Sequence, residues 1–252
     1  MYYYIEVYNK MKKKILLIII LIASIALTIF ILKPLKKEEL KTDNIKFKEE
    51  YEKLNGQINK KNNKKYRNVS IPKENPFIYS NAKDIINRIN NKETFVVYFG
   101  FNSCPWCRSV LPTLIEVSEY LEVETIYYVD VLEIRNTLSL NDDNEIETTK
   151  EGTKEYNELV ELLSNVLEDY TLTDKEDNEV ETGEKRIYAP NVVTVVEGEV
   201  IALETGISDI QDDAYMELTK EIKKESYDKL YKILDDFKIR ESMCGINQDT
   251  GC

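Results

Sequence analysis

The residues of this 252-residue sequence best suited to chemistry are its four cysteines, because it contains no histidine. Without an imidazole, the chain cannot build a Ser-His-Asp or Cys-His hydrolase or a His-ligated catalytic zinc site. The cysteines form two pairs, a C-x-x-C motif at Cys104 and Cys107 and a tail pair at Cys244 and Cys252. A C-x-x-C motif is typical of thiol–disulfide exchange, of half a zinc site or of a structural bridge.

The flanking residues predict that the motif lies between a strand and a helix. Residues 94–101 (TFVVYFGF) are mostly aromatic or β-branched, as in a buried central strand. Apolar residues recur at helical spacing after Cys107. A thiol at a helix N-terminus has a lowered pKa, and we expect Cys104 to be exposed there and to attack substrates. Cys107, one turn on, would resolve the mixed disulfide.

The redox interpretation makes Pro105 and Trp106 the active-site dipeptide and predicts neither a metal nor an organic cofactor. An inert disulfide is one alternative to it. A zinc site is another, and its further ligands would have to be Cys244, Cys252 or carboxylates.

The tail pair encloses a short segment that contains glycine and asparagine, residues 244–252. Such turn residues allow a local structural disulfide between Cys244 and Cys252. The pair could instead relay electrons to or from the C-x-x-C motif, or act as a resolving partner for substrates. Four pairable cysteines in a chain with a membrane segment favour an oxidising compartment.

Three helices are predicted from caps and apolar spacing elsewhere in the chain. Ser80 or Asn81 could cap a short amphipathic helix. An apolar stripe predicts a second helix over residues 156–170, and a third would start after a cap at Asp212 and reach about residue 237.

The strand, the motif and the following helix, which contains Pro112, resemble the active-site region of the thioredoxin superfamily. Downstream, Tyr188-Ala189-Pro190-Asn191 leads into an apolar hairpin and resembles the family's cis-proline loop. The resemblance implies an α/β thioredoxin-like fold, a central mixed sheet flanked by helices, over residues 68–240. It also implies that the Ala189–Pro190 bond is cis and forms a substrate platform beside the dithiol; an ordinary loop proline is the alternative. The wording Val-Tyr-Phe-Gly in the strand is similar to the branch called bacteriocin transport accessory proteins.

The sequence departs from the thioredoxin pattern at two places. The family carries a buried aspartate six residues before the first cysteine, where it relays a proton from the resolving thiol. Tyr98 occupies that position here, so the relay is absent or replaced. The dipeptide between the cysteines is Pro-Trp, without histidine. We therefore expect neither a strongly oxidising enzyme nor an efficient general thioredoxin.

An insert of about residues 132–187 precedes the cis-proline loop and contains 6 basic and 17 acidic residues. It would lie next to the substrate groove. The insert either selects a binding partner or is a surface segment without a role in binding.

The N-terminal part of the sequence predicts a membrane anchor. Residues 15–32 are an uncharged run of apolar and small residues, long enough to span a bilayer as a helix. Residues 1–14 form a basic segment ahead of it, and residues 33–67 are rich in Lys, Asn and Glu, as in a stalk. A cleaved signal peptide is the alternative to an anchor.

These features predict a single-pass membrane protein whose C-terminal body, residues 68–240 with the tail 241–252, lies outside the cytoplasmic membrane. Its partners would be protein or peptide thiols and disulfides, an unidentified redox partner, and membrane lipid through residues 15–32. The net charge of -12 argues against nucleic acid as a ligand. The first functional hypothesis is a thiol–disulfide oxidoreductase. The second is a thioredoxin-fold accessory module for peptide export or maturation whose dithiol is incidental.

Overall fold

The computed structural model describes residue 4, residues 10–16, 18, 19 and 21, and residues 41–60 and 62–246. The chain divides into two units, residues 1–41 and residues 42–252, and all the elements below belong to the second. Most of the expected anchor, residues 15–32, lies outside the described residues. Among the residues that are described, no helix combines the length and the apolar character needed to cross a membrane.

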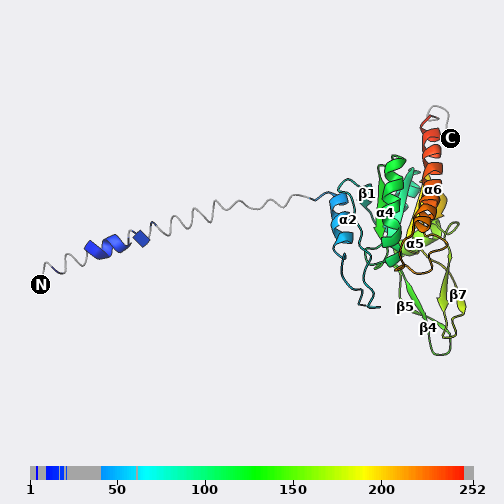
Figure 1. Cartoon of the computed structure of the whole chain (residues 1–252), viewed down its shortest axis with the longest axis horizontal. Helices are drawn as coiled ribbons and strands as arrows, with labels where there is room; N and C mark the ends of the chain where they lie inside the picture. The colour runs from blue at the N-terminus through cyan, green and yellow to red at the C-terminus, as the bar shows by residue number, and fades with distance from the viewer. Residues whose placement is uncertain are drawn as a thin grey trace. The chain divides into compact units, whose positions relative to one another are not determined.

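A five-stranded mixed sheet in the order β1-β3-β2-β8-β9 forms the centre of the second unit (Figure 1). Strands β1 (Phe77–Tyr79), β3 (Ile126–Asp130) and β2 (Phe95–Gly100) are parallel. Strands β8 (Asn191–Val196) and β9 (Glu199–Glu204) form a hairpin that joins the sheet with β8 antiparallel to β2.

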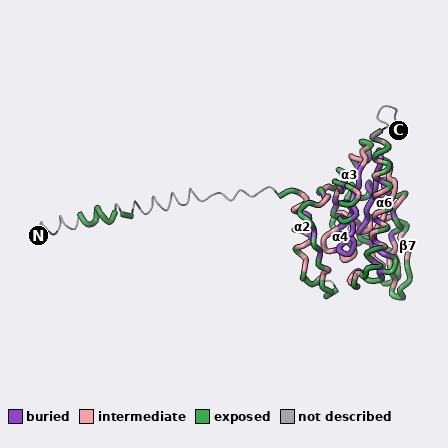
Figure 2. The backbone as a smooth tube through the Cα atoms, turned by 45° about the horizontal axis from the view of Figure 1, so that its top comes forward, coloured by how far each residue is buried: buried purple, intermediate pink, exposed green. Residues whose placement is uncertain are grey.

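Helices cover both faces of this sheet, because alternate residues of each strand point to opposite faces. Helices α4 (Pro105–Tyr120) and α6 (Lys220–Ile246) share one core with Val96 and Tyr98 of β2. Helices α3 (Ala82–Asn90) and α5 (Lys154–Leu162) share the other core with Phe95, Val97 and Phe99. Figure 2 shows the buried residues, in purple, running through the interior between these helices. The structure is an α/β thioredoxin-like mixed sheet flanked by helices, which confirms the expected fold class at that level.

The compact unit begins at Thr42, inside the segment of residues 33–67 that the sequence favours as a stalk. Helix α2 (Asp43–Glu52) packs on β1 through Phe47 and Tyr51, which are fully buried. The ring of Phe47 stacks on Phe77 with 4.0 Å between centroids. Two aromatic residues one turn apart are the only buried positions of an otherwise polar helix, so composition conceals its place in the core.

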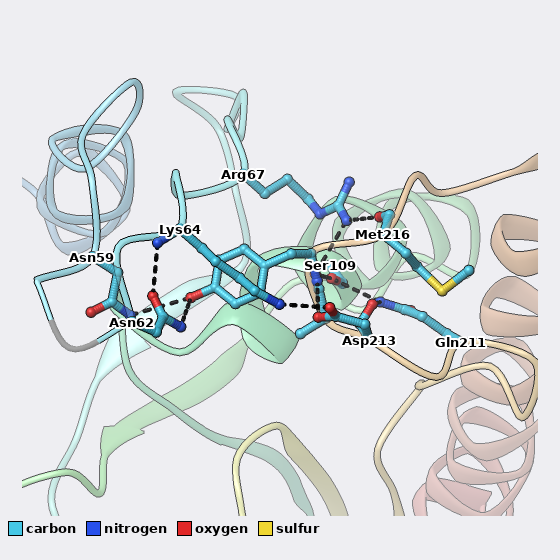
Figure 3. Close-up of polar contacts among 10 residues, drawn as sticks. Asn59, Asn62, Lys64, Arg67, Ser109, Gln211, Asp213 and Met216 are labelled. Carbon is cyan, nitrogen blue, oxygen red and sulfur yellow. Dashed lines mark hydrogen bonds and ion pairs between the residues drawn. The ribbon is translucent and has the colours of Figure 1, made fainter.

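Hydrogen bonds and an ion pair connect the residues after α2 to the loop that precedes α6 (Figure 3). Asn62 Nδ2 donates to the Tyr215 hydroxyl at 2.9 Å, and Lys64 Nζ pairs with Asp213 Oδ2 at 2.7 Å. Arg67 Nη2 donates to two backbone carbonyls in the same loop. The whole segment from Thr42 therefore contributes to the domain that positions the C-x-x-C motif.

The segment between β3 and β8 consists of two hairpins and a helix. Strands β4 (Thr137–Leu140) and β5 (Ile146–Lys150) form the hairpin before α5, and strands β6 (Asp169–Thr173) and β7 (Glu179–Lys185) form the one after it. Both hairpins extend from the same end of the domain (Figure 1). An ion pair of 3.0 Å joins Lys175 to Asp142 at their turns.

Two expected helices differ from the structure. The helix over residues 156–170 is wrong in length, because α5 ends at Leu162 and the chain continues through a turn into β6. The stripe appeared continuous because Leu167, after the turn, and Tyr170, in β6, are also buried. Asp212 does not cap α6; Thr219 does, since its hydroxyl accepts the backbone N–H of Ile222 at 3.3 Å. Asn81, by contrast, caps α3 as expected, by accepting the N–H of Asp84.

Candidate redox site

Strand β2 and helix α4 position Cys104 at the helix N-terminus. Cys104 is the N-cap residue, with φ −73° and ψ 118°, and Pro105 occupies the first turn, where its missing N–H costs nothing. The Cys104 sulfur accepts the backbone N–H of Cys107 at 3.1 Å. The two cysteines are thus one helical turn apart, as their spacing predicts, and both are free thiols.

Both cysteines are covered by protein. Cys104 is 3% exposed and Cys107 is 0% exposed. The expectation that Cys104 is exposed is therefore wrong. Its thiol donates a hydrogen bond to the carbonyl oxygen of Ala189 at 3.3 Å, so the loop before Pro190 lies against it. The Ala189–Pro190 peptide bond is cis, the isomer that the resemblance implies.

The two thiols differ in acidity. Burial opposes ionisation of Cys104, but hydrogen bonds from the Cys107 side chain and from the Cys107 and Trp106 backbone, with the positive charge of Arg135, hold its pKa below the usual thiol value. Burial raises the pKa of Cys107 well above that value, and the neighbouring Cys104 raises it further. Cys104 is therefore the more acidic thiol of the pair and ionises more readily, as a nucleophile must.

Arg135 is a site residue that sequence reasoning missed. It lies just beyond the end of β3, with its guanidinium carbon 5.0 Å from the ring centroid of Phe101. It supplies to Cys104 the positive charge that an active-site histidine would otherwise provide. The sequence signal was weak, because a single arginine in an acidic segment has no pattern that links it to a motif far away in the chain.

Tyr98 occupies the interior beside the resolving cysteine. Its ring packs between Phe77 and Tyr128, with centroids 5.6 and 6.0 Å away. Its hydroxyl is buried beside Cys107 and Tyr51 and makes no hydrogen bond of acceptable geometry with any described residue.

The absence of a side chain at Gly100 leaves space for the Tyr98 ring. A Cβ atom at position 100 would lie 2.7–2.8 Å from the Tyr98 ring carbons and hydroxyl. That is closer than such atoms can approach without displacing the ring.

Arg108 connects the site to the N-terminal segment of the domain. Its guanidinium is fully buried and donates to the carbonyls of Tyr51 at 2.8 Å and Arg67 at 2.7 Å. It also donates to Asn55 Oδ1 at 2.7 Å and to the Asn102 carbonyl at 3.2 Å. No described carboxylate pairs with it, so neutral carbonyl and amide oxygens surround this buried charge.

The tail cysteines are not placed beside this site by the structure. The backbone of Cys244 belongs to α6, its side chain is not described, and Cys252 lies outside the described residues. Among the described residues, no group of cysteine and carboxylate side chains could hold a metal ion.

Comparisons with known proteins do not show a family for this chain. No family model matches the sequence, and no curated protein matches it. Solved structures that match include thioredoxin O2 from Arabidopsis thaliana in its oxidized state, with 14% identity and a TM-score of 0.28. That match covers 53% of this chain and 85% of the plant chain. None of these comparisons supports the bacteriocin transport accessory branch. The thioredoxin-like assignment therefore rests on the strand order and on the position of the cysteine pair.

Proposed function

We propose that this protein is a thiol–disulfide oxidoreductase that cycles Cys104 and Cys107 between dithiol and disulfide. The observation that carries the proposal is the hydrogen bond of 3.1 Å from the Cys107 N–H to the Cys104 sulfur at the start of α4. This bond favours the thiolate of Cys104 and holds the two cysteines one turn apart, as an exchange reaction requires.

The reaction proceeds in two exchanges. In the reducing direction, the Cys104 thiolate attacks one sulfur of a substrate disulfide, forms a mixed disulfide and releases the first substrate thiolate. Cys107 then loses its proton, attacks the Cys104 sulfur and releases the second substrate thiolate. Two electrons pass from the dithiol to the substrate, and the two thiol protons end on the substrate thiols. Oxidation of a substrate dithiol is the reverse.

The loop before Pro190 supplies the substrate platform. The carbonyl of Ala189 lies 3.3 Å from the Cys104 sulfur, so a chain that pairs with this backbone would bring its own cysteine to the nucleophile. Extended peptides bind in this way by adding main-chain hydrogen bonds at an open backbone edge. The substrates we propose are accordingly proteins or peptides that present a cysteine in an extended segment.

The proposal includes a membrane-anchored location. The apolar run of residues 15–32 would anchor the chain, with the redox domain on the extracytoplasmic side of the membrane. The four cysteines could form two disulfides, which favours an oxidising compartment and therefore the extracytoplasmic side. Protease added to intact, wall-stripped cells should then digest the domain, and protection of the domain would contradict this part of the proposal.

Trapping experiments test the activity itself. In the full chain, Cys107→Ser should accumulate mixed disulfides with substrates because the resolving thiol is gone. The matched variant Cys104→Ser should accumulate none. If neither variant traps a partner and the wild type does not reduce a protein disulfide, the alternative of an accessory module with an incidental dithiol takes its place.

A further inference from the structure

Two arginines lie on the active-site side of the insert. Arg135 follows β3, and Arg186 follows β7 and leads into the cis-proline loop. The guanidinium carbon of Arg186 lies 3.9 Å from the ring centroid of Tyr170 and 5.8 Å from that of Tyr188. Each guanidinium is therefore held against aromatic rings.

Neither arginine has a carboxylate partner in the part of the chain that the structure describes. No ion pair and no side-chain hydrogen bond of either one occurs there. Arg186 is only 6% exposed, and its Nη1 atom is buried without a partner. The carboxylate of Asp130 feels the charge of Arg135 but forms no ion pair with it. Two partly or fully buried cations without a carboxylate partner cost free energy that a bound anion would offset.

The two charges act on each other and on the nucleophile. The two arginines lie on adjacent segments, because Asn136 Nδ2, next to Arg135, donates to Glu184 Oε2, two residues before Arg186, at 2.7 Å. Burial lowers the pKa of Arg135, and the positive charge of Arg186 lowers it further. Arg135 also acts on Cys104. Arg186 is three residues before Ala189, whose carbonyl contacts the Cys104 sulfur. An anion held by these arginines would therefore lie close to the reacting cysteine of a bound substrate.

The insert fixes this arrangement through hydroxyl groups. The Tyr156 hydroxyl on α5 accepts the N–H of Ile187 at 3.3 Å, beside Arg186. The Tyr170 hydroxyl on β6 accepts the N–H of Leu138 at 3.2 Å, and the Tyr188 hydroxyl donates to the backbone of β6. These buried or half-buried tyrosines link both hairpins and α5 to the segment that carries Arg186.

We propose that Arg135 and Arg186 form a carboxylate-binding subsite that selects substrates with an acidic residue next to the reactive cysteine. The inference rests on the proposed oxidoreductase activity and names its substrate class. The surrounding insert is strongly acidic, with 17 acidic and 6 basic residues. The excess of acidic residues on the insert therefore repels a negatively charged segment in general, whereas this subsite attracts it, which is how charge patterns create specificity.

The test compares matched peptides in one reaction. Three peptides carry Asp, Asn or Lys beside a single cysteine that is activated as a mixed disulfide with neutral thiopyridine. The reduced full chain attacks the peptide sulfur through Cys104, and the departing thiopyridine is followed by its absorbance. We expect the Asp peptide to react about tenfold faster than the Asn peptide, the effect of one charge-assisted hydrogen bond, and the Lys peptide to react most slowly.

Substitutions assign the preference to the two arginines. Arg186→Gln and Arg135→Gln should each bring the Asp-to-Asn rate ratio close to one. The ratio is the readout because Arg135→Gln also slows every peptide by weakening the Cys104 thiolate. Lys175→Gln removes the same charge from the exposed turn of the second hairpin and should leave the ratio unchanged. Arg186→Lys keeps the charge without the planar fork and should give an intermediate ratio.

Three results would overturn the inference. The first is a wild-type ratio near one. The second is a wild-type Asp-to-Asn rate ratio that does not fall as ionic strength rises. This measurement uses the wild-type protein alone, so it does not depend on whether a variant folds. The third is a preference that survives Arg186→Gln. If none of the peptides reacts, the proposed oxidoreductase activity fails, and the subsite inference fails with it.

Discussion

Replacing Tyr98 by phenylalanine removes one buried hydroxyl from the interior beside Cys107. A buried hydroxyl without a partner costs about 1–3 kcal/mol. The vacated space is smaller than a methylene group and costs under about 1 kcal/mol. We therefore expect Tyr98→Phe to raise the free energy of unfolding of the reduced protein by about 1 kcal/mol, in urea denaturation with an unchanged slope.

The same substitution should slow the redox cycle. Burial is the main cause of the raised pKa of Cys107, and the Tyr98 hydroxyl partly counters it by interacting with the thiolate. The hydroxyl has no partner while Cys107 is a neutral thiol, but it can donate to the thiolate that forms during resolution. A hydrogen bond to a charged group contributes about 1.5–3 kcal/mol, and one pKa unit corresponds to about 1.4 kcal/mol. Loss of the hydroxyl should therefore slow resolution of a preformed Cys104 mixed disulfide by about tenfold to a hundredfold at neutral pH.

Tyr128→Phe is the matched control on the neighbouring strand. Its hydroxyl donates to Glu50 Oε1 at 3.2 Å, so its removal should destabilise the protein by about 1–3 kcal/mol and leave resolution unchanged. The reasoning is refuted if Tyr98→Phe is less stable than the wild type and resolves the mixed disulfide at the wild-type rate.

Three further predictions concern the nucleophile, the N-terminal helix and a helix cap. In the reduced full chain, the alkylation rate of Cys104 should rise with pH over a range below that of an ordinary thiol, whereas Cys107 should react only at much higher pH. Mass spectrometry of the labelled peptides distinguishes the two cysteines, and equal alkylation rates would contradict the pKa difference. Phe47→Ala should lower the free energy of unfolding by about 3–5 kcal/mol in a denaturant titration, because a fully buried ring is lost, and an effect below about 1 kcal/mol would show that α2 is not part of the core. Asn81→Ala should cost about 1 kcal/mol in the same titration, and Asn81→Ser, which keeps an acceptor, should recover most of it.

Local patterns were sufficient for the elements that carry the cysteine pair. The strand before the motif is apolar on both sides, the helix after it has apolar residues at helical spacing, and the two cysteines are three residues apart. Each of these signals acts over a few residues, so the chain itself encodes it wherever the segment lies. The expectation that Cys104 ends up at a helix N-terminus with Cys107 one turn on follows from them.

Longer patterns gave less reliable predictions. A stripe of apolar residues over 156–170 looked like one helix, because a helix, a turn and a strand can all direct side chains into the same core. Residues 45–54 of the expected stalk favour a helix, but the place of α2 in the core was hidden for the opposite reason, since only Phe47 and Tyr51 of its residues are buried. In both cases the deciding contact is with a distant part of the chain, and hydrophobic periodicity does not contain it.

By itself, the sequence determined the chemistry of the site: a thiol pair, no imidazole, a strand and a helix to hold the pair, and the cis-proline loop implied by resemblance. Only the tertiary structure decided the surroundings that tune that chemistry. It brings the charge of Arg135 to act on Cys104, places the Tyr98 hydroxyl beside Cys107, and covers Cys104 with the carbonyl of Ala189. The physical reason is that charge and burial act through space, so the acidity of a thiol depends on residues that the fold brings close, however far apart they are in the chain.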